Sequence, residues 1–420
     1  MTKRILLRMP KGPFEVVSPE QTALDNRIGS NVGNAVFLDA AYKYLDTSDA
    51  EITPDCFAEH RMGADYINER FDVYVIPLAN GFRTTFMRFL SRMTEVVEGL
   101  KIPVVVLGGG LQASLPYKPG VRRPQDETVT RFLKAVLDRS PKVGVRGEYT
   151  LDYLNRLGFK DVEVIGCPSM FQHGLNLNVT KRAPSLDRDS RISINITPRI
   201  AQMGPIVMSH LERYPNLTYI GQEMDLLRLL LWGEKYPKFT VPNDVPIDAS
   251  HPIVRDGQTR FWVDPWPWME FLRSQDFAFG TRIHGNIAAI LAGTPAYVFG
   301  HDTRTLELAR YFGIPNREMS AVPADIDAAQ LYEEADFTEL HAGHPERFAR
   351  FFSYLEAHGL RHVFMDGEDP DAFDRRISAI RFPPSVDLLS GSATRRRQRH
   401  VARRAHRLAT KVRKLVSVGA

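Results

Sequence analysis

The stretch DFAFGTRIHGNIAAILAGTPAYVFGHDTRTLELARYFGIP, residues Asp276–Pro315, alternates apolar strands with helical segments. Its first apolar run ends at Gly280, and a helix of small residues follows. A second apolar strand and a second helix complete the stretch. Strands that alternate with helices are typical of parallel sheets built from βαβ units. Two chemically active side chains, Arg282 and His284, stand where the first strand meets its helix.

The residues around this strand-to-helix turn favour an anion site. A helix start carries unpaired N–H groups and a partial positive charge, so it attracts anions. Gly280 permits a tight turn, and Thr281 is the predicted N-cap. Arg282 adds a planar cation, and His284 adds a proton donor near neutral pH. A capping or packing role for these side chains is the alternative.

The rest of the chain repeats the alternation in two series. The first series predicts strands at 4–9, 71–79, 102–110, 142–147 and 161–166 and helices at 34–45, 84–100, 127–138 and 148–159. A polar linker at 176–190 separates it from the second series, with strands at 191–197, 217–222 and 276–280 and helices at 205–214 and 224–233. The fold class is therefore α/β, with two Rossmann-like domains facing a cleft. The expected units are 1–185, 186–330, closing helices in 331–385 (near 345–358 and 371–380), and a basic amphipathic tail at 386–420.

The composition limits the class of protein. The chain has 420 residues, 43% of them hydrophobic and 25% charged, which fits two globular domains. No apolar run approaches the roughly 20 residues that a membrane-spanning helix needs. The two cysteines, Cys56 and Cys167, belong to no Cys–His cluster, which argues against a disulfide framework and against a metal site. We expect a cytoplasmic protein without a metal.

The C-terminal tail is strongly basic. Ten arginines and lysines and no acidic residue follow Asp387, although the whole chain has a net charge of only +4. Between residues 395 and 416, apolar positions recur at helical spacing opposite the arginines. This pattern predicts an interfacial helix on an anionic membrane, at the inner face of the plasma membrane. A disordered basic tail is the alternative, and the absence of aromatic residues after Phe382 gives specific nucleic-acid binding little support.

The block Gly280–Pro315 resembles the polysaccharide pyruvyl transferase family. That family has a strand, a Ser/Thr-x-Arg-x-His motif, a small-residue helix, a Gly-x-Pro turn, a strand, and an Asp with a downstream Glu. The matching residues are Thr281, Arg282, His284, Ala288, Gly293, Pro295, Asp302 and Glu307. Weaker similarity extends upstream to residue 27, in GSNVGNAVF, VGVRGEYTLDYLNRLGF and ISINITPR. The sequence departs from the family at Asn34, where Asp is usual, and at PLANGF, where a glycine-rich loop is usual.

The resemblance implies a transferase that moves the enolpyruvyl group of phosphoenolpyruvate onto a saccharide and closes a pyruvate ketal. It implies no cofactor beyond phosphoenolpyruvate as co-substrate. The acceptor would be a sugar of a polysaccharide, a glycolipid or a lipid-linked glycan, as in exopolysaccharide biosynthesis. The first domain would take the acceptor, and the second would take phosphoenolpyruvate.

The resemblance also assigns roles to individual residues. Gly280, Thr281, Arg282 and Arg199 would hold the donor, with His284 as general acid or as proton donor to the departing phosphate. Glu223 and Asp302 are candidates for the carboxylate base. The residues proposed for the acceptor or the cleft are Asn31, Asn34, Gly109, Asp302 and Glu307.

Several of these residues have a structural alternative. Asp302 and Glu307 would then cap a loop, with Arg304 and Arg310 as their partners. The tryptophans Trp262, Trp266 and Trp268 form either a sugar-stacking edge or an ordinary hydrophobic segment.

Two other functions fit the same sequence. A GT-B-like glycosyltransferase would also place a helix start under a diphosphate, and Glu307 would then bind ribose hydroxyls. A non-catalytic scaffold attached to a membrane by its tail is the second alternative.

Overall fold

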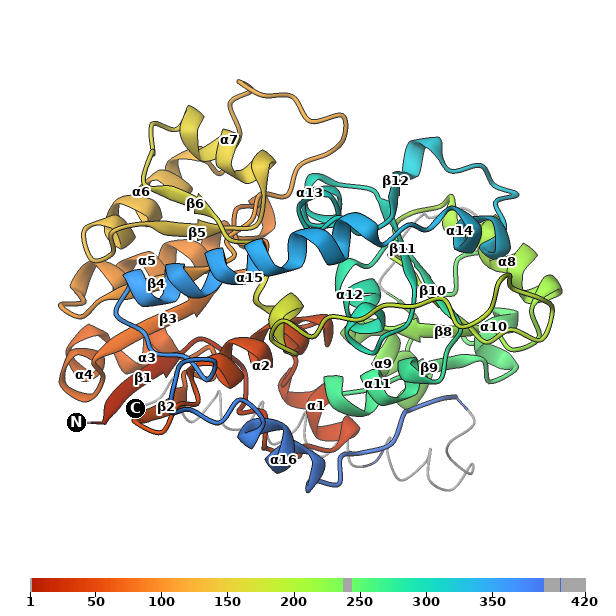
Figure 1. The fold of residues 1–420 in the computed structure, drawn as a ribbon, viewed down its shortest axis with the longest axis horizontal. Helices are drawn as coiled ribbons and strands as arrows, with labels where there is room; N and C mark the ends of the chain where they lie inside the picture. Colours follow the sequence, from red (N-terminus) through yellow and green to blue (C-terminus); the bar gives the residue numbers. More distant parts are fainter. Residues whose placement is uncertain (1, 237–243, 389–400, 402–420) are drawn as a thin grey trace.

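Two parallel sheets organise the structure (Figure 1). The computed structural model describes residues 2–236, 244–388 and 401. The first sheet has the order β2-β1-β3-β4, with β1 at Lys3–Leu7, β2 at Ala50–Pro54, β3 at Val73–Pro77 and β4 at Val104–Leu107. The strands β5 (Val143–Val145) and β6 (Val162–Val164) extend it, because a parallel bridge joins Gly109 beyond β4 to Val145.

The second sheet has six parallel strands in the order β12-β11-β10-β7-β8-β9. Their bounds are Ile192–Asn195 for β7, Thr218–Gly221 for β8, Thr259–Phe261 for β9, Phe277–Gly280 for β10, Ala296–Gly300 for β11 and Asn316–Glu318 for β12. Numbered within the domain, the order is 3-2-1-4-5-6, as in Rossmann folds. The direction of winding therefore reverses between β7 and β10, which is where such sheets bind ligands.

Helices cover both sheets. The first domain has α1 (Pro19–Asp25), α2 (Gly33–Leu45), α3 (Glu59–Met62), α4 (Ala64–Arg70), α5 (Met87–Gly99), α6 (Asp126–Leu137) and α7 (Glu148–Arg156). The second has α8 (Met203–Arg213), α9 (Met224–Trp232), α10 (Pro252–Arg255), α11 (Pro265–Arg273), α12 (Ile283–Leu291), α13 (Thr303–Phe312) and α14 (Ala328–Glu334). Short 3₁₀ segments lie at Thr84–Phe86, Pro168–Phe171 and Met319–Ala321. The helices α15 (Thr338–Ala357) and α16 (Ala372–Ser378) complete the described chain.

The long helix α15 ties the two domains together. It runs from the second domain across to the first (Figure 1). Near its end, the Tyr354 hydroxyl accepts a hydrogen bond from the Gly144 N–H at 2.8 Å and donates to the Val106 carbonyl at 2.9 Å. The sequence predicted a helix near 345–358, and the structure begins it about two turns earlier, at Thr338. Pro345 therefore lies inside the helix instead of at its start.

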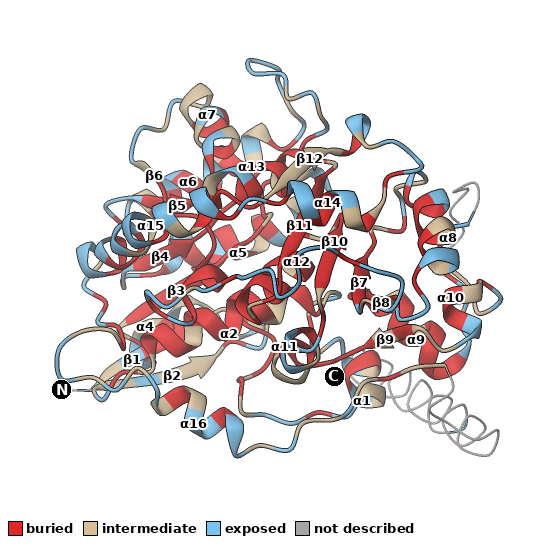
Figure 2. Ribbon diagram, turned by 45° about the vertical axis from the view of Figure 1, so that its right-hand side comes forward, coloured by how far each residue is buried: buried red, intermediate tan, exposed pale blue. Residues whose placement is uncertain are grey.

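The structure confirms the predicted class, α/β with two Rossmann-like domains. The first sheet ends at β6 and the second begins at β7, on either side of the predicted linker at 176–190. The sequence did not predict β2 and β9. Both are short edge strands with polar residues, so neither forms the apolar run that marks a central strand. Figure 2 shows β2 as only intermediately buried, whereas the central strands are buried.

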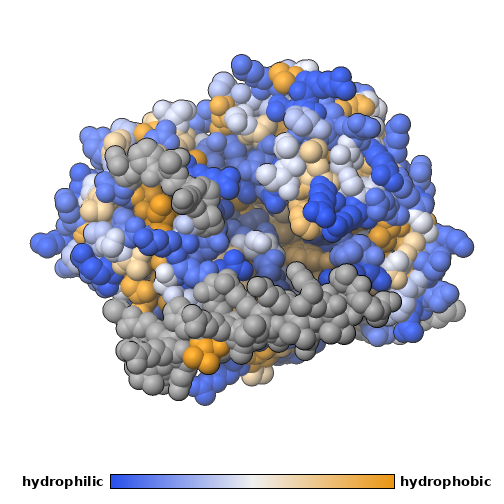
Figure 3. Space-filling model, turned by 180° about the vertical axis from the view of Figure 1, so that it is seen from behind, coloured by the Kyte–Doolittle hydropathy of each residue, from blue (hydrophilic) through white to orange (hydrophobic). Residues whose placement is uncertain are grey.

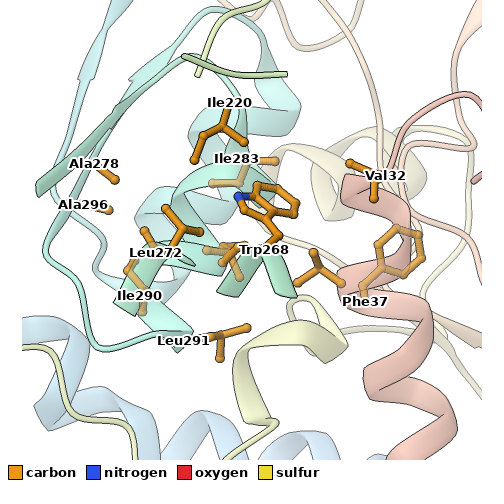
Figure 4. Packing of buried hydrophobic residues seen from close by; sticks show 14 of the residues in the cluster. Val32, Phe37, Ile220, Trp268, Leu272, Ala278, Ile283, Ile290, Leu291 and Ala296 are labelled. Atoms are coloured by element: carbon orange, nitrogen blue, oxygen red, sulfur yellow. The ribbon is translucent and has the colours of Figure 1, made fainter. Parts of the chain in front are cut away.

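The tryptophan segment is part of the core. Trp268 is 1% exposed and packs among residues such as Leu272 and Ile283 (Figure 4). Trp262 is also buried, and Trp266 is half-buried with its indole N–H 3.2 Å from Asp39. Of the two readings of these residues, the ordinary hydrophobic segment is correct. The sugar-stacking edge is wrong for Trp262 and Trp268, because their rings are covered.

The basic tail, residues 395–416, lies outside the described residues except for residue 401. No helix in the described part of the chain is long and apolar enough to cross a membrane. Seen from behind, the described surface is mostly hydrophilic, with hydrophobic residues in separate small groups (Figure 3).

Candidate functional site

The turn between β10 and α12 is held by buried asparagines. The Asn195 side chain, at the end of β7, accepts a hydrogen bond from the Arg282 N–H at 2.7 Å. Its amide donates to Asn286 Oδ1 at 3.0 Å, and Asn286 in turn donates to the Gly280 carbonyl at 3.1 Å. Because all these groups are buried or nearly so, leaving one unpaired would be costly. The network fixes the turn at the point where the sheet reverses its winding.

Two small residues make this turn possible. Gly280 has φ of +142°, and a Cβ atom there would collide with the Asn195 backbone carbonyl. Thr281 is fully buried, and its hydroxyl accepts from the Thr197 N–H at 2.7 Å. The prediction that Thr281 caps α12 is therefore wrong. Arg282 is the N-cap residue, without a side-chain cap bond, because the threonine hydroxyl ties the β7 loop to the β10 loop instead.

His284 lies in the first turn of α12 against the first domain. Its ring is tilted against Phe37 of α2 at a centroid distance of 5.3 Å, and its Nε2 atom is 3.6 Å from the Cys167 sulfur. Burial and the nearby Arg146, Arg304 and Arg282 lower the pKa of His284 well below 6.5. We expected a proton donor near neutral pH, but in the ligand-free protein this imidazole is neutral and keeps a single N–H.

Three arginines from both domains surround the histidine. Burial and the neighbouring Arg304 lower the pKa of Arg282 to about 9. Arg282 pairs with the Glu223 carboxylate and donates to the Ile196 carbonyl at 3.3 Å. Arg146 is 1% exposed and donates to the Gly108 carbonyl at 3.0 Å. Mutual repulsion of these cations in a low dielectric favours an anionic ligand between them.

A cavity of ≈ 420 Å³ opens between the domains beside this cluster. The second domain contributes Gln222, Arg282, Ile283, His284 and Arg304 to its lining, and the first contributes Arg146 with loops that follow β1, β2 and β3. The carboxyl ends of parallel strands form one rim, where open α/β sheets bind ligands.

The N-terminal loop contributes two of the predicted acceptor residues, Asn31 and Asn34, to this cavity. Asn31 Oδ1 accepts from the Gly33 N–H at 2.8 Å, and the Asn34 amide donates to the Gly29 carbonyl at 3.0 Å. The neighbouring Val32 N–H donates to the Gln222 carbonyl at 2.9 Å. Both asparagine side chains therefore stabilise the loop internally, and the Val32 backbone bonds it to the second domain.

The candidate base Glu223 stands one residue before α9 and is not among the residues that line the cavity. Its carboxylate is paired with Arg282, so its structural effect is to hold that guanidinium. Arg199 is exposed and also lies outside the lining, although its charge contributes to lowering the pKa of Arg282.

The three remaining candidates of the cleft have structural partners. Asp302 caps α13 through Thr305, accepts from Gln112 at 3.0 Å, and has Arg304 at 3.4 Å. The Gly109 N–H donates to the Gly144 carbonyl at 2.9 Å and is part of the sheet. Neither residue is among those that line the cavity.

Glu307 joins α13 to the start of α7 in the first domain. Its carboxylate accepts from the Thr150 N–H at 3.0 Å and bonds the Thr150 hydroxyl at 2.9 Å. Burial raises its pKa to about 8. The expected partner Arg310 instead contacts Glu318 and Tyr149, so the pairing of Glu307 with Arg310 is wrong.

Five arginines of the cavity were not among the predicted site residues. They are Arg8, Arg83, Arg92, Arg146 and Arg304. Arg8 and Arg146 lie near the ends of the predicted strands 4–9 and 142–147, each directly after the observed strand, and that position was an available signal. Arg83 follows β3 by six residues and Arg304 lies inside a helix, so only the fold brings them to the cavity.

In the described residues, no group of three His, Cys, Asp or Glu side chains could hold a metal ion. The cavity instead collects arginines, amides and the imidazoles of His60 and His284. These groups suit the recognition of a small polyanion.

The sequence matches the family model of polysaccharide pyruvyl transferases over residues 31–303, more than half of the chain. The chain belongs to this family, and it is therefore a transferase of polysaccharide biosynthesis. No curated protein matches the chain.

Similar solved structures include S. aureus MnaA with UDP (12% identity, 84% of this chain and 98% of that chain covered, TM-score 0.43). They also include a Methanocaldococcus jannaschii UDP-GlcNAc 2-epimerase with UDP-GlcNAc and UDP (11% identity, 84% of this chain and 100% of that chain covered, TM-score 0.41). A putative UDP-N-acetylglucosamine 2-epimerase from Listeria monocytogenes is 11% identical, with 91% of this chain and 99% of that chain covered and a TM-score of 0.40. At TM-scores below 0.5 these likenesses support no conclusion about function. The two parallel sheets and the cavity between them are the evidence for a GT-B-like arrangement.

Proposed function

We propose that this protein uses phosphoenolpyruvate as donor and forms a cyclic pyruvate ketal on a saccharide. The observation that carries the proposal is the group of Arg146, Arg282, Arg304 and His284 at the start of α12, beside the cavity. Phosphoenolpyruvate carries a phosphate and a carboxylate on three carbons. A compact ligand with two anionic groups matches several converging cations better than a neutral one does.

The donor would bind with its anionic groups toward Arg282 and Arg304 and the N-terminus of α12. The first N–H groups of a helix have no intrahelical acceptor, so they can bind oxygen atoms of the donor. The Asn195 and Asn286 network holds these N–H groups in place before the ligand arrives, which lowers the cost of ordering the site.

The reaction needs a proton donor and two acceptor hydroxyls. A proton is added to the methylene carbon of phosphoenolpyruvate, and one sugar hydroxyl attacks the adjacent carbon and loses its proton. A second hydroxyl of the sugar then forms the other C–O bond and loses its proton, while phosphate leaves with the C–O bond electrons and takes up a proton. His284 is the titratable group among the cations, and a bound trianion opposes the arginine charges that lower its pKa. Donor binding would thereby charge the imidazole and make it a general acid.

The alternative functions receive less support from the geometry. A sugar-nucleotide glycosyltransferase was expected to use Glu307 on ribose hydroxyls, but Glu307 is buried against Thr150. A non-catalytic scaffold has no need of repelling arginines beside an open cavity, since each buried charge costs stability. We therefore retain pyruvyl transfer.

Thermal unfolding with and without ligands tests the proposal, because a ligand that binds only the native state raises the melting temperature. We expect phosphoenolpyruvate to raise it, and Arg282→Gln to abolish the rise. The exposed Arg255, which pairs with the adjacent Asp256, gives the matched control Arg255→Gln. A rise with UDP-sugars and none with phosphoenolpyruvate would establish glycosyl transfer instead. If neither ligand raises the melting temperature, the scaffold function is favoured.

We also propose that the protein is cytoplasmic and peripheral on the inner face of the plasma membrane, bound through residues 395–416. The sequence pattern of that segment is the support. Co-sedimentation with vesicles of anionic and of neutral lipid tests it, with a chain truncated after residue 388 as control. Loss of binding on truncation is the expected result, and equal binding by both chains would contradict the proposal.

A further inference from the structure

One wall of the cavity combines arginines with exposed aromatic rings. Its residues follow the carboxyl ends of three neighbouring strands of the first sheet: Arg8 after β1, Phe57 after β2, and Arg83, Phe86 and Phe89 after β3. We call these five residues the phenylalanine–arginine wall. It lies on the first domain, and the same cavity is lined by Arg282 and His284 of the second.

The aromatic part of the wall is a platform open to the cavity. The rings of Phe86 and Phe89 are stacked at 26° with centroids 5.6 Å apart. Phe89 is 57% exposed, which is unusual for a large apolar side chain at the mouth of a polar cavity. A flat, exposed aromatic surface beside hydrogen-bonding groups is suited to the apolar face of a sugar ring.

In the described part of the chain, the arginines of the wall have no acid as an ion-pair partner. Arg8 lies over the rings of Phe57 at 4.5 Å and Phe86 at 5.8 Å, and Arg83 lies over Phe86 at 5.4 Å. The Nε atoms of Arg8 and Arg83 are buried without a hydrogen-bond partner among the described residues. The two guanidinium groups are therefore held by ring contacts, and their N–H groups lack an acceptor in the described chain.

The other arginines near His284 have protein partners. Arg146 is bonded to the Gly108 carbonyl, Arg282 is paired with Glu223, and Arg304 lies 3.4 Å from Asp302, although the Arg304 Nε atom also has no hydrogen-bond partner. Arg8 and Arg83, in contrast, form no ion pair among the described residues. A donor bound at α12 leaves them without an anion.

Two acids of the first domain lie near the wall and reduce its positive charge, and Asp302 of the second domain acts on Arg83. Asp55 is engaged by the Met9 N–H at 3.1 Å and the Tyr74 hydroxyl at 2.7 Å, and burial raises its pKa to about 6. Glu59 is buried and lines the cavity. The lining also includes the cation Arg92, so Arg8, Arg83 and Arg92 outnumber the two carboxylates.

We propose that the phenylalanine–arginine wall is the acceptor subsite and that the acceptor is an anionic saccharide. Its ring lies on Phe86 and Phe89, and its phosphate or carboxylate group binds the N–H edges of Arg8 and Arg83. The proposal rests on the proposed function, because the hydroxyls of this saccharide must face a donor held at α12.

Calorimetric titration of the full-length protein tests the subsite with glucose 1-phosphate, glucuronate and methyl glucoside, each with and without phosphoenolpyruvate. We expect the two anionic sugars, or one of them, to bind at least about tenfold more tightly than methyl glucoside, as one charged hydrogen bond requires. Binding of glucose 1-phosphate alone identifies a phosphorylated acceptor, and binding of glucuronate alone identifies a uronic acid. Equal affinity for the neutral sugar, or no binding of any sugar, overturns the proposal.

Variants separate the two parts of the wall. Arg8→Gln should weaken the anionic sugar about tenfold, and Phe89→Ala should weaken it severalfold, while the melting-temperature rise with phosphoenolpyruvate persists in both. The exposed neighbours Arg88 and Tyr66, which do not line the cavity, give the controls Arg88→Gln and Tyr66→Ala. If Arg8→Gln fails to fold, Arg92→Gln replaces it. Unchanged sugar binding in Phe89→Ala and the arginine variant overturns the subsite, whereas loss of phosphoenolpyruvate binding in the wild type overturns the proposed function.

Discussion

The sulfur of Cys167 lies 3.6 Å from Nε2 of His284. The same sulfur accepts from the Ser169 hydroxyl at 3.1 Å and faces an Arg146 N–H group at 4.0 Å. Because two donors already face the sulfur, we expect its own hydrogen to be directed at the histidine. A neutral imidazole has one donor and one acceptor nitrogen, so this arrangement predicts the ring hydrogen of His284 on Nδ1. Cys167 would then be a positioning residue for the histidine.

Removal of this thiol should allow His284 to adopt either neutral tautomer. In Cys167→Ala we expect both neutral tautomers of His284 in ¹⁵N spectra, and kcat lowered about tenfold, the scale of one lost hydrogen bond. KM for phosphoenolpyruvate should change less, because the arginines remain. Cys167→Ser, which restores a hydroxyl donor, should recover most of kcat. The exposed Cys56 gives the control Cys56→Ala, and an unchanged tautomer in Cys167→Ala would disprove the positioning role.

Binding of phosphoenolpyruvate should take up a proton. In the free protein, burial and three arginines lower the pKa of His284 well below 6.5, and a bound trianion raises it. The group is therefore neutral before binding and charged after it, so affinity is highest at low pH and falls as pH rises through the pKa of the complex. Calorimetry in buffers of different ionisation enthalpy measures the uptake.

The ligand phosphate also titrates near pH 6, and His284→Gln controls for it. This variant should keep the proton uptake of the ligand and lose that of the histidine. Equal uptake by the wild type and His284→Gln would show that the imidazole stays neutral in the complex.

The sequence predicted the anion site through residues that are contiguous in the chain. Gly280, Arg282 and His284 lie within five positions, so the strand-to-helix turn keeps them close along the chain, although Asn195 and Thr197 at the end of β7 hold the turn in place. The central strands were predicted for a similar reason, since burial on both faces leaves a continuous apolar run in the sequence. Such elements can be predicted from the sequence because the residues that define them are adjacent in the chain.

The other residues of the cavity are separated by long stretches of chain. Arg8, Arg83 and Arg304 meet only because β1 and β3 end, and α13 begins, at one rim, and an isolated arginine has no local pattern to mark it. Thr281 was misassigned for a related reason. Its hydroxyl could cap the following helix, but it instead accepts a hydrogen bond from the Thr197 N–H, just beyond the neighbouring strand β7. A tertiary partner overrode a local preference.

Substitution of Asn195 should weaken both the fold and the donor site. Asn195→Ala leaves the Arg282 N–H and the Asn286 side chain without their acceptor and donor. Each unpaired buried group costs about 1–3 kcal/mol, so we expect the free energy of unfolding to fall by about 2–4 kcal/mol. Denaturant unfolding measures this change. Asn216, an exposed residue bonded to the Asp189 carbonyl, gives the control Asn216→Ala, for which we expect at most a small loss. Equal losses in both variants would show that the network has no special weight.

Glu307 should stabilise the protein most when it is protonated. Burial raises its pKa to about 8 from an ordinary value near 4.5. The folded protein therefore binds a proton that the unfolded chain releases between these values, so this contribution is complete below about pH 4.5 and is lost as pH rises through 8. We expect the melting temperature of the wild type to fall between pH 7 and 9 by more than that of Glu307→Gln, a neutral side chain that can still accept from Thr150. Glu307→Ala should lower stability at every pH, because the Thr150 N–H loses its acceptor.

Pyruvyl transfer by Glu307→Gln should remain near the wild-type rate, since the carboxylate does not line the cavity. A large loss of kcat in a stable Glu307→Gln protein would instead place this carboxylate in the reaction.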